Sequence, residues 1–304
     1  MLYLTAGVHC RLVRIYKIGD IVLIKSANVE VTNVCNASCD LCSRTQLKNV
    51  MKIPKQHLNL ETFKQLDWEN TEMNYFVLCG GFGDPILHPK LFELIDIIHN
   101  LNIKIILHTN GEPFYSRWWT RLAETLNDVD RVTFGLDGLT KDTHEKYRGT
   151  NFDRVIRNIR TFTGAGGNAG INYIVFKHNE HEIPEVEDFA KKLGLKYTQI
   201  RRSRTYNDKL QAPSEKTKKE HKIWTKPCFM DIGEVSIDLD GKIHLCCQAY
   251  VRWFIKEMRP VWLKNGHKPL KRYDTFKQLQ NSIYLKYIKE MDLCNPCGQH
   301  ELIV

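Results

Sequence analysis

Two hydrophobic patterns alternate along the chain. Short apolar runs rich in valine, isoleucine and phenylalanine are separated by longer segments in which apolar residues recur every three or four positions. The first pattern predicts buried strands and the second predicts amphipathic helices. In the segment 88–101, for example, Leu91, Leu94, Ile95 and Ile98 fall on one face of a helix.

These patterns predict a strand–loop–helix unit that repeats along much of the chain. Strands are expected over 29–34, 75–79, 103–108, 131–136, 171–176 and 196–200, and helices over 60–68, 88–101, 117–126, 141–147, 152–162 and 183–193. A further short strand is expected over 18–25. Because alternating strands and helices favour a parallel sheet, the predicted fold is α/β, an open partial (βα)6 barrel. Ligands of such sheets bind at the carboxyl ends of the strands.

The alternation ends near residue 201, which suggests a division of the chain. Residues 1–27 are expected to form an N-terminal extension, 28–201 the barrel, 202–227 a basic linker and 228–304 a small C-terminal domain with a β-hairpin and helices. The hairpin strands are predicted over 233–238 and 242–245. They flank Asp240-Gly241, and Asp-Gly between two apolar runs is a strong hairpin signal.

Composition favours a globular cytoplasmic protein. The 304 residues are 42% hydrophobic and 26% charged. No apolar run is long enough to span a bilayer, and no signal-peptide cleavage pattern follows residues 1–7. The ten cysteines, most of them in short groups, favour metal binding in a reducing compartment. The net charge of +9 is explained by solubility and gives only weak support for nucleic-acid binding.

Three cysteines follow the first predicted barrel strand. Cys35, Cys39 and Cys42 have the spacing C-x3-C-x2-C. Three thiolates can hold three irons of a four-iron cluster and leave the fourth iron open to a substrate. A zinc knuckle is the alternative, but structural zinc sites use four ligands, usually in two pairs. The spacing therefore favours a cluster.

Polar and glycine-rich loops follow the next three strands. The loop Gly80-Gly81-Phe82-Gly83-Asp84-Pro85 follows the second, and its glycines allow close backbone approach to a ligand. Thr109-Asn110-Gly111 and Leu136-Asp137-Gly138 follow the third and fourth, where turn formation is the alternative role. Arg148 brings a cation suited to a carboxylate near the same edge.

Together these motifs resemble those of radical S-adenosylmethionine (radical SAM) enzymes. The resemblance covers residues 28–201 and includes the segment from His178 to Ile183. It implies that Cys35, Cys39 and Cys42 ligate a [4Fe-4S] cluster whose open iron is chelated by S-adenosylmethionine. Reduction of the cluster then cleaves the sulfonium to methionine and a 5′-deoxyadenosyl radical, which abstracts a substrate hydrogen.

The resemblance also implies which residues contact S-adenosylmethionine. Leu41 would lie by the adenine, the Gly-rich loop would hold the amino group and Arg148 the carboxylate. The full predicted set is Leu41, Gly80, Gly81, Gly83, Asp84, Thr109, Asp137, Arg148 and Asn179. Two positions depart from the family pattern. Asp84 stands where the motif usually has Glu, and Gly135 stands where many relatives have Ser, which puts one hydrogen bond to the co-substrate in question.

A second cysteine group lies in the C-terminal region. Cys228, Cys246, Cys294 and Cys297 can close a second cluster completely, or form a four-thiolate zinc site. The spacing from Cys228 through Gly241 to Cys246 resembles that of SPASM and twitch domains, and selects Cys246 over the adjacent Cys247. The expected form is a twitch domain with one auxiliary [4Fe-4S] cluster.

An auxiliary cluster without an open iron favours an oxidation, in which it accepts one electron from a substrate radical. Arg201 and Arg202, after the sixth strand, are candidates for binding an anionic substrate or assisting proton removal, with linker solvation as the alternative. The substrate is expected to be a small molecule or a peptide, and the reductant a flavodoxin- or ferredoxin-type protein. A peptide- or protein-modifying enzyme and a nucleic-acid-modifying enzyme remain alternatives.

Overall fold

Six parallel strands of the main sheet lie side by side in chain order. The computed structural model describes residues 17–18, 21–22, 24–48, 54–79, 81–203, 205–220, 234–244 and 272–280. The strands are β3 (Ser26–Val29), β4 (Tyr75–Leu78), β5 (Lys104–Thr109), β6 (Arg131–Gly135), β7 (Ala169–Val175) and β8 (Tyr197–Arg202). The predicted α/β fold with six parallel strands is therefore confirmed.

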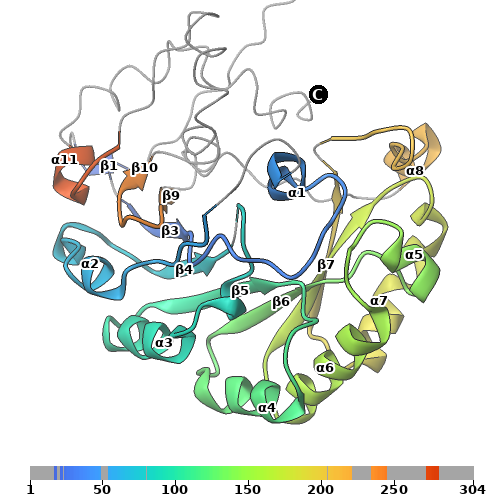
Figure 1. The fold of residues 1–304 in the computed structure, drawn as a ribbon, viewed down its shortest axis with the longest axis horizontal. Coiled ribbons are helices and arrows are strands. Elements are labelled where there is room, and N and C mark those ends of the chain that lie inside the picture. Colours follow the sequence, from blue (N-terminus) through green and yellow to red (C-terminus); the bar gives the residue numbers. More distant parts are fainter. Residues whose placement is uncertain are drawn as a thin grey trace, which may run out of the picture.

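The four larger helices lie along the outer side of this curved sheet, as in a partial barrel (Figure 1). The larger ones are α3 (Leu91–Asn100), α4 (Ser116–Thr125), α6 (Phe152–Gly164) and α7 (Ile183–Lys192). The shorter ones are α1 (Ser43–Lys48), α2 (Leu60–Lys64), η1 (Trp68–Asn70), η2 (Pro85–Leu87), α5 (Lys141–Glu145), η3 (Glu180–Glu182), α8 (Glu215–Glu220) and α11 (Phe276–Gln280). The helix predicted over 60–68 is thus interrupted, with α2 and η1 in its place.

The first barrel strand lies earlier than the predicted range 29–34. β3 ends at Val29, and although the Glu30 N–H still donates to the Ile237 carbonyl (2.9 Å), the residues from Val31 onward bond to a different segment. The Leu58 N–H donates to the Val31 carbonyl (2.9 Å), so the chain here pairs with residues 56–58 instead of with a neighbouring strand of the sheet. An apolar run indicates burial but does not identify the partner of its hydrogen bonds.

The strand predicted over 18–25 is wrong. Residues Lys17–Ile18 (β1) and Ile21–Val22 (β2) form a separate antiparallel pair. Gly19 and Asp20 stand between them, a dipeptide that favours a turn.

The predicted hairpin is confirmed, and its first strand extends the barrel sheet. β9 (Glu234–Ile237) runs antiparallel to β10 (Ile243–His244), and Gly241 between them has a left-handed φ of 75°. β9 also pairs in parallel with β3, giving an eight-stranded sheet in the described residues. Val235 and Ile237 are buried in the same apolar core as β3, which joins the hairpin to the barrel.

Part of the segment predicted as a basic linker packs on the barrel. Leu210 is fully buried. The Lys177 N–H donates to the Gln211 carbonyl (3.0 Å), and the Ser214 N–H donates to the Glu180 carboxylate (2.6 Å). Polar composition therefore did not indicate solvation here, because main-chain groups and one buried leucine fix the segment.

The two faces of the sheet differ in polarity. On β3 and just after it, Ala27 and Val29 lie in the apolar core shared with the helices, whereas Asn28 and Glu30 alternate onto the inner face. The inner face carries polar pairs on other strands as well, such as the Thr133 and Tyr197 hydroxyls (2.7 Å). This polar lining places hydrogen-bonding groups inside the barrel.

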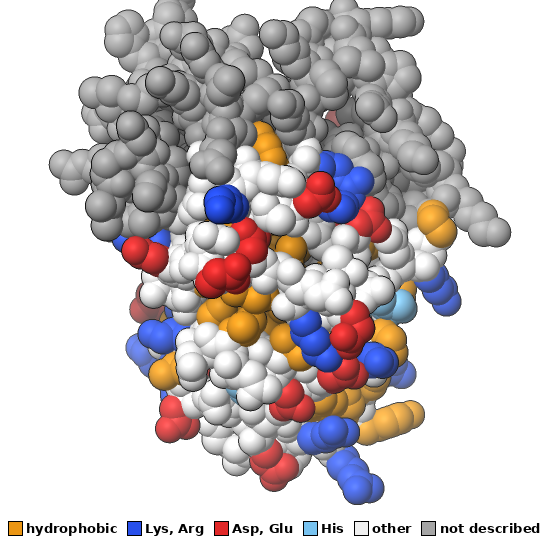
Figure 2. All heavy atoms as spheres, turned by 90° about the vertical axis from the view of Figure 1, so that its left-hand side faces the viewer, with side chains coloured by type: hydrophobic (Ala, Val, Ile, Leu, Met, Phe, Trp, Pro, Cys, Tyr) orange, Lys and Arg blue, Asp and Glu red, His pale blue; other side chains and the backbone are white. Residues whose placement is uncertain are grey.

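The outer surface on the α2–α3 side carries both signs of charge. Figure 2 shows this side, where hydrophobic side chains form a central patch with Lys or Arg and Asp or Glu interleaved around it. Among the described helices, none combines the length and apolar character needed to cross a membrane.

Candidate active site

The cysteine triplet lies on the loop that leaves β3. Cys39 is buried, Cys35 and Cys42 are half-buried, and none of the three is in a disulfide. The loop turns so that the Cys42 N–H donates to the Cys39 carbonyl (3.1 Å). Burial, aided by the nearby Asp84 carboxylate, raises the pKa of Cys35 to about 12, and burial also raises the pKa of Cys39. Thiolates at these positions therefore need a bound cation to be stable.

Asn110, the middle residue of the predicted Thr109-Asn110-Gly111 motif, joins this loop to the end of β5. Asn110 Nδ2 lies 3.7 Å from Cys35 Sγ and donates to the Asn36 side-chain oxygen (2.9 Å). The Asn36 amide in turn donates to Glu112 (2.6 Å). Asn110 thus contacts a predicted cluster ligand directly, whereas the predicted set of ligand contacts includes only the preceding residue, Thr109.

Asp84 ties the Gly-rich loop to the same strand end. One carboxylate oxygen accepts the Thr109 hydroxyl (3.0 Å) and the Asn110 N–H (2.7 Å), and the other accepts the Ile86 N–H (3.3 Å). Burial raises the pKa of Asp84 to about 6, against the opposing effect of these bonds. The carboxylate is thus engaged by protein donors, and we expect main-chain atoms of the loop to bind any ligand there.

Two glycines permit close backbone approach around the cysteine loop. A Cβ on Gly83 would lie 1.9 Å from the Thr32 carbonyl oxygen, and a Cβ on Gly149 would lie 2.6 Å from the Ser38 nitrogen. Any larger residue at either position would separate segments that now touch. The Gly-rich loop and the segment that follows Arg148 are therefore held against the chain on both sides of the thiols.

Arg148 and Asp137 form a buried ion pair beyond the end of β6. Arg148 Nε donates to Asp137, which is fully buried. Burial acts to lower the pKa of Arg148, but Asp137 and then Cys39 raise it on balance, so the guanidinium stays charged. A cation beside Cys39 suits both a negatively charged thiolate cluster and a carboxylate ligand.

Neighbouring side chains hold Asp137 through its main chain. The Asp137 N–H donates to His144 Nδ1 (3.3 Å), and Asn179 Nδ2 donates to the Asp137 carbonyl (2.9 Å). Burial and the nearby Arg148 charge lower the pKa of His144 to about 3. The neutral ring therefore accepts at Nδ1 and donates from Nε2 to Thr150 (3.0 Å). The predicted ligand contact Asn179 is fully buried and fixes the main chain here.

Gly135, which stands where the family pattern often has Ser, lies against the guanidinium of Arg148. A Cβ on Gly135 would lie 2.5–2.7 Å from three atoms of the Arg148 guanidinium. A serine, as found in many relatives, cannot share this space with the guanidinium. The missing side chain on β6 therefore gives Arg148 room beside Asp137.

Gly135→Ala should weaken the binding of S-adenosylmethionine strongly while lowering the stability of the fold only slightly. The new methyl group displaces the end of a flexible side chain, so we expect the free energy of unfolding to fall by only about 1 kcal/mol. Affinity for S-adenosylmethionine should fall about tenfold or more, because the Nη atoms of Arg148 are displaced while its Nε keeps the bond to Asp137. Equilibrium binding and denaturant unfolding measure the two effects. Unchanged affinity would show that Arg148 does not bind the ligand from this position.

Glu30 is a buried acid just after β3, on the inner face of the sheet. Its Oε1 accepts the Gly81 N–H, and among the described residues its buried Oε2 has no hydrogen-bond partner. Burial raises the pKa of Glu30 to about 8, with hydrogen bonds from Gly81 and Phe82 opposing the shift. The carboxyl group is therefore largely protonated at neutral pH. It holds the Gly-rich loop by accepting the Gly81 N–H.

Glu30→Gln should flatten the pH dependence of stability. The folded protein holds the Glu30 proton more tightly than the unfolded chain, in which the pKa is near 4.5. Stability should therefore fall as pH rises from about 4.5 to about 8, with a slope approaching about 1.4 kcal/mol per pH unit. Glutamine cannot ionise, so the variant loses this slope. Denaturant unfolding across this pH range measures it, and equal slopes in both proteins would contradict the assignment.

The structure does not bring Arg201 and Arg202 together. Both belong to β8, and their side chains point to opposite faces because a strand alternates. Arg201 pairs in register with Ile174 and bonds to Gln199 on the inner face, whereas Arg202 pairs with the core residue Val175. Arg201 alone is thus placed to face a substrate inside the barrel.

The remaining predicted residues have the following positions. Leu41 is half-buried in the turn between Cys39 and Cys42, and Thr109 is buried at the end of β5. Gly80 and the four C-terminal thiols, Cys228, Cys246, Cys294 and Cys297, lie outside the described residues.

The donor set suits a cluster better than a single ion. In the described parts of the chain, no three Cys, His, Asp or Glu side chains are placed to hold one metal ion. A zinc ion needs thiolates converging to about 2.3 Å from a single point. The thiolates of a four-iron cluster bind different irons and stand further apart. The three free thiols and the charged Arg148 therefore fit such a cluster.

Three free thiols near the carboxyl edge of a parallel sheet are the arrangement expected of an iron–sulfur enzyme of the partial-barrel class. The family model described as the Radical SAM superfamily matches residues 29–190, and the chain belongs to this superfamily. Membership implies a [4Fe-4S] cluster and S-adenosylmethionine.

Relatives of several activities share part of the sequence. The mycofactocin maturase MftC of Mycobacterium tuberculosis is 29% identical over 178 residues, covering 57% of this chain and 44% of that protein. The AdoMet-dependent heme synthase of Methanosarcina barkeri is 27% identical over 167 residues, covering 54% and 46%. The matched part therefore spans less than half the length of these relatives.

Solved structures share the fold. Streptococcus suis SuiB bound to S-adenosylmethionine matches with a TM-score of 0.65 at 14% identity, covering 93% of this chain and 73% of that one. SuiB bound to the precursor peptide SuiA matches with a TM-score of 0.66 at 13% identity, covering 93% and 72%. At such identities the likeness establishes the fold alone.

Proposed function

We propose that this radical SAM enzyme removes a hydrogen atom from its substrate and completes an oxidation. The observation that carries the proposal is the juxtaposition of the Cys35–Cys39–Cys42 loop with the buried Arg148–Asp137 pair. This arrangement would provide cluster ligands and a carboxylate-binding cation at one edge of the barrel. The polar inner face places hydrogen-bonding groups where a substrate would enter.

Residues around the thiols would bind and orient the co-substrate. Arg148 would bind the carboxylate of S-adenosylmethionine, the main chain of Gly81 and Gly83 its amino group, and Leu41 would lie by the adenine. When bound, the cluster supplies one electron to the sulfonium, which yields methionine and a 5′-deoxyadenosyl radical. Asp137 would keep the Arg148 guanidinium oriented and charged.

A peptide is the substrate class that we favour. One relative is named a mycofactocin maturase, and a structural neighbour holds its precursor peptide. A small molecule is the second candidate, favoured by the relatives named AdoMet-dependent heme synthase and probable GTP 3′,8-cyclase. Arg201, on the inner face, would contact an anionic group of either substrate.

The oxidation would need an acceptor for one electron. Cys228, Cys246, Cys294 and Cys297 would hold an auxiliary cluster, and that cluster would supply the one-electron acceptor for a substrate radical that has lost a proton. The double variant Cys294→Ala/Cys297→Ala should then still form 5′-deoxyadenosine but no oxidised product. An unchanged yield of product would contradict this role.

Anaerobic reconstitution tests the proposal. Two four-iron clusters require about eight irons per chain, and dithionite with S-adenosylmethionine should yield 5′-deoxyadenosine. About four irons together with one zinc would overturn the auxiliary-cluster assignment. Absence of 5′-deoxyadenosine from fully loaded protein would overturn the proposed activity itself.

A further inference from the structure

A short loop connects the cysteine site to the outer surface of the barrel. It comprises residues 110–115, between β5 and α4, and we call it the bridge loop. At its inner end, Asn110 contacts Cys35 Sγ and its side-chain oxygen accepts the Glu112 N–H (3.0 Å). Glu112 also accepts the Asn36 amide. The loop is therefore in direct contact with the segment that carries the first thiol.

The bridge loop is fixed by two helices, α4, which follows it in the chain, and α6, which lies beside it. Asn158 of α6 is fully buried and donates to the carbonyls of Gly111 (2.8 Å) and Glu112 (3.0 Å). Trp119 of α4 donates from Nε1 to the Pro113 carbonyl (2.9 Å). These bonds hold the main chain, so the outer end of the loop is presented in one position.

That outer end exposes two aromatic residues. The Phe114 side chain is 39% exposed and the Tyr115 side chain 84%, whereas large apolar side chains in the described residues are rarely exposed. Phe114 has a φ of 74°, a left-handed conformation that costs a bulky residue free energy. Its ring stacks on Trp118 with centroids 4.4 Å apart. Exposed, strained aromatics at such a point suit contact with a partner.

The surface around these aromatics is basic. Helices α4 and α6, which pack side by side, carry Arg117, Arg121, Arg154, Arg157 and Arg160, all exposed, against Glu124 and Asp153, a net charge of +3. The other two long helices on the outer side are acidic, with α3 at −2 and α7 at −1. The positive charge therefore gathers beside the bridge loop.

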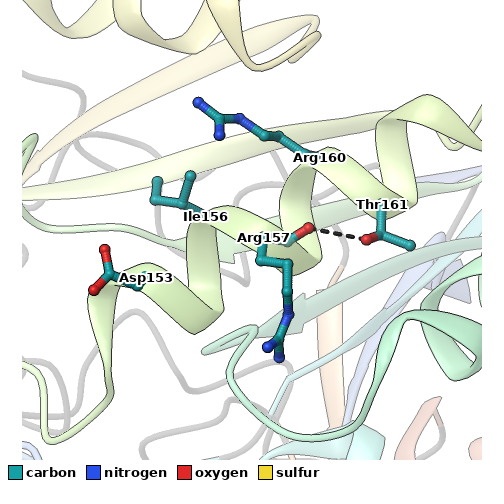
Figure 3. Close-up of a pocket in the computed structure, with 5 residues that line it drawn as sticks. All are labelled: Asp153, Ile156, Arg157, Arg160 and Thr161. Carbon is teal, nitrogen blue, oxygen red and sulfur yellow. Dashed lines mark hydrogen bonds between the residues drawn. The ribbon is translucent and has the colours of Figure 1, made fainter.

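The one hollow described on the basic surface lies on α6 and is open to solvent. That hollow is lined by Asp153, Ile156, Arg157, Arg160 and Thr161, which all belong to one helix. In Figure 3 the side chains of Arg157 and Arg160 extend from the helix in different directions. They do not converge on a single anionic group, so a small ligand is a poor match and a wide acidic surface is a better one.

We propose that the bridge loop and the basic α4–α6 face form the docking surface for an acidic one-electron carrier protein. The inference rests on the proposed function, because cleavage of S-adenosylmethionine consumes one electron at the cluster. The reduced carrier loses that electron and the oxidised cluster gains it. Phe114 and Tyr115 form the apolar centre of the contact, and the arginines steer an acidic partner onto it.

The test compares a protein reductant with a small one. The variant Tyr115→Ala/Arg117→Glu/Arg160→Glu changes exposed side chains that make none of the bonds anchoring the loop. With reduced flavodoxin as the electron source, kcat/KM for flavodoxin in 5′-deoxyadenosine formation should fall about tenfold or more. With dithionite the rate should be unchanged. In the unaltered protein, only the flavodoxin-driven rate should fall as ionic strength rises.

A matched control reverses charge on another helix. Lys191→Glu/Lys192→Glu changes the net charge equally on the exposed end of α7 and should leave both rates unchanged. Equal loss with both reductants in the bridge-loop variant, or equal loss in the control, would overturn the docking assignment. So would tighter binding of a single-stranded oligonucleotide than of flavodoxin to this face. Absence of dithionite-driven cleavage in the unaltered protein would instead contradict the proposed function.

Discussion

Cys39→Ala should abolish the reductive cleavage of S-adenosylmethionine. Cys39 is the buried member of the triplet, and its loss leaves two thiolates for a cluster that needs three. We expect reconstituted protein to lose about four irons per chain, and 5′-deoxyadenosine formation to fall by more than about 1,000-fold, since no other group of the site supplies the electron. Iron analysis and product quantification measure both losses.

Cys79→Ala is the matched control for this variant. Cys79 is a half-buried thiol just after β4, also outside any disulfide, and it does not belong to the C-x3-C-x2-C motif. The control should retain its iron and its activity. If Cys79→Ala lost iron as fully as Cys39→Ala, the cluster ligands would need to be reassigned.

Arg148→Met should damage both stability and activity. It leaves Asp137 as a buried, unpaired carboxylate, so we expect the free energy of unfolding to fall by about 3–5 kcal/mol. The kcat/KM for S-adenosylmethionine should fall about 100-fold, because charge-assisted bonds to its carboxylate are lost. Denaturant unfolding and steady-state kinetics measure the two effects.

A second substitution separates these two effects. Arg148→Met/Asp137→Asn removes the unpaired charge but keeps a side-chain oxygen for the Ile174 N–H, which Asp137 now accepts. Most of the lost stability should return, while activity stays low. Recovery of activity together with stability would show that Arg148 only holds the fold and does not bind the co-substrate.

The parallel sheet was predictable because burial and periodicity are local properties of sequence. The runs at 103–108 and 131–136 became β5 and β6 within one residue at each end. The pairing of β9 with β3 was not predictable, because it depends on which sheet edge the hairpin meets after folding. A hairpin signal such as Asp240-Gly241 predicts the turn between β9 and β10. It does not predict that β9 also pairs with β3.

The site was predictable to the extent that its chemistry requires particular residue types. Thiols, glycines and one arginine could be read from spacing and from family resemblance. The contacts of Asn110 with Cys35 and of Asn36 with Glu112 could not, because they join segments more than seventy residues apart. Glu30 did carry a signal, since an acid within an apolar run is either exposed or held by specific partners.

The pairing of β3 with β9 affects the order in which the chain can fold during synthesis. Ser26 lies opposite Glu234, so one side of β3 remains an open edge until more than two hundred further residues have been made. At about 5–20 residues per second, translation leaves that edge unpaired for roughly 10–40 s. Open edges of apolar strands invite pairing with other chains. The nascent barrel should therefore depend on chaperone protection until its last parallel strand leaves the ribosome.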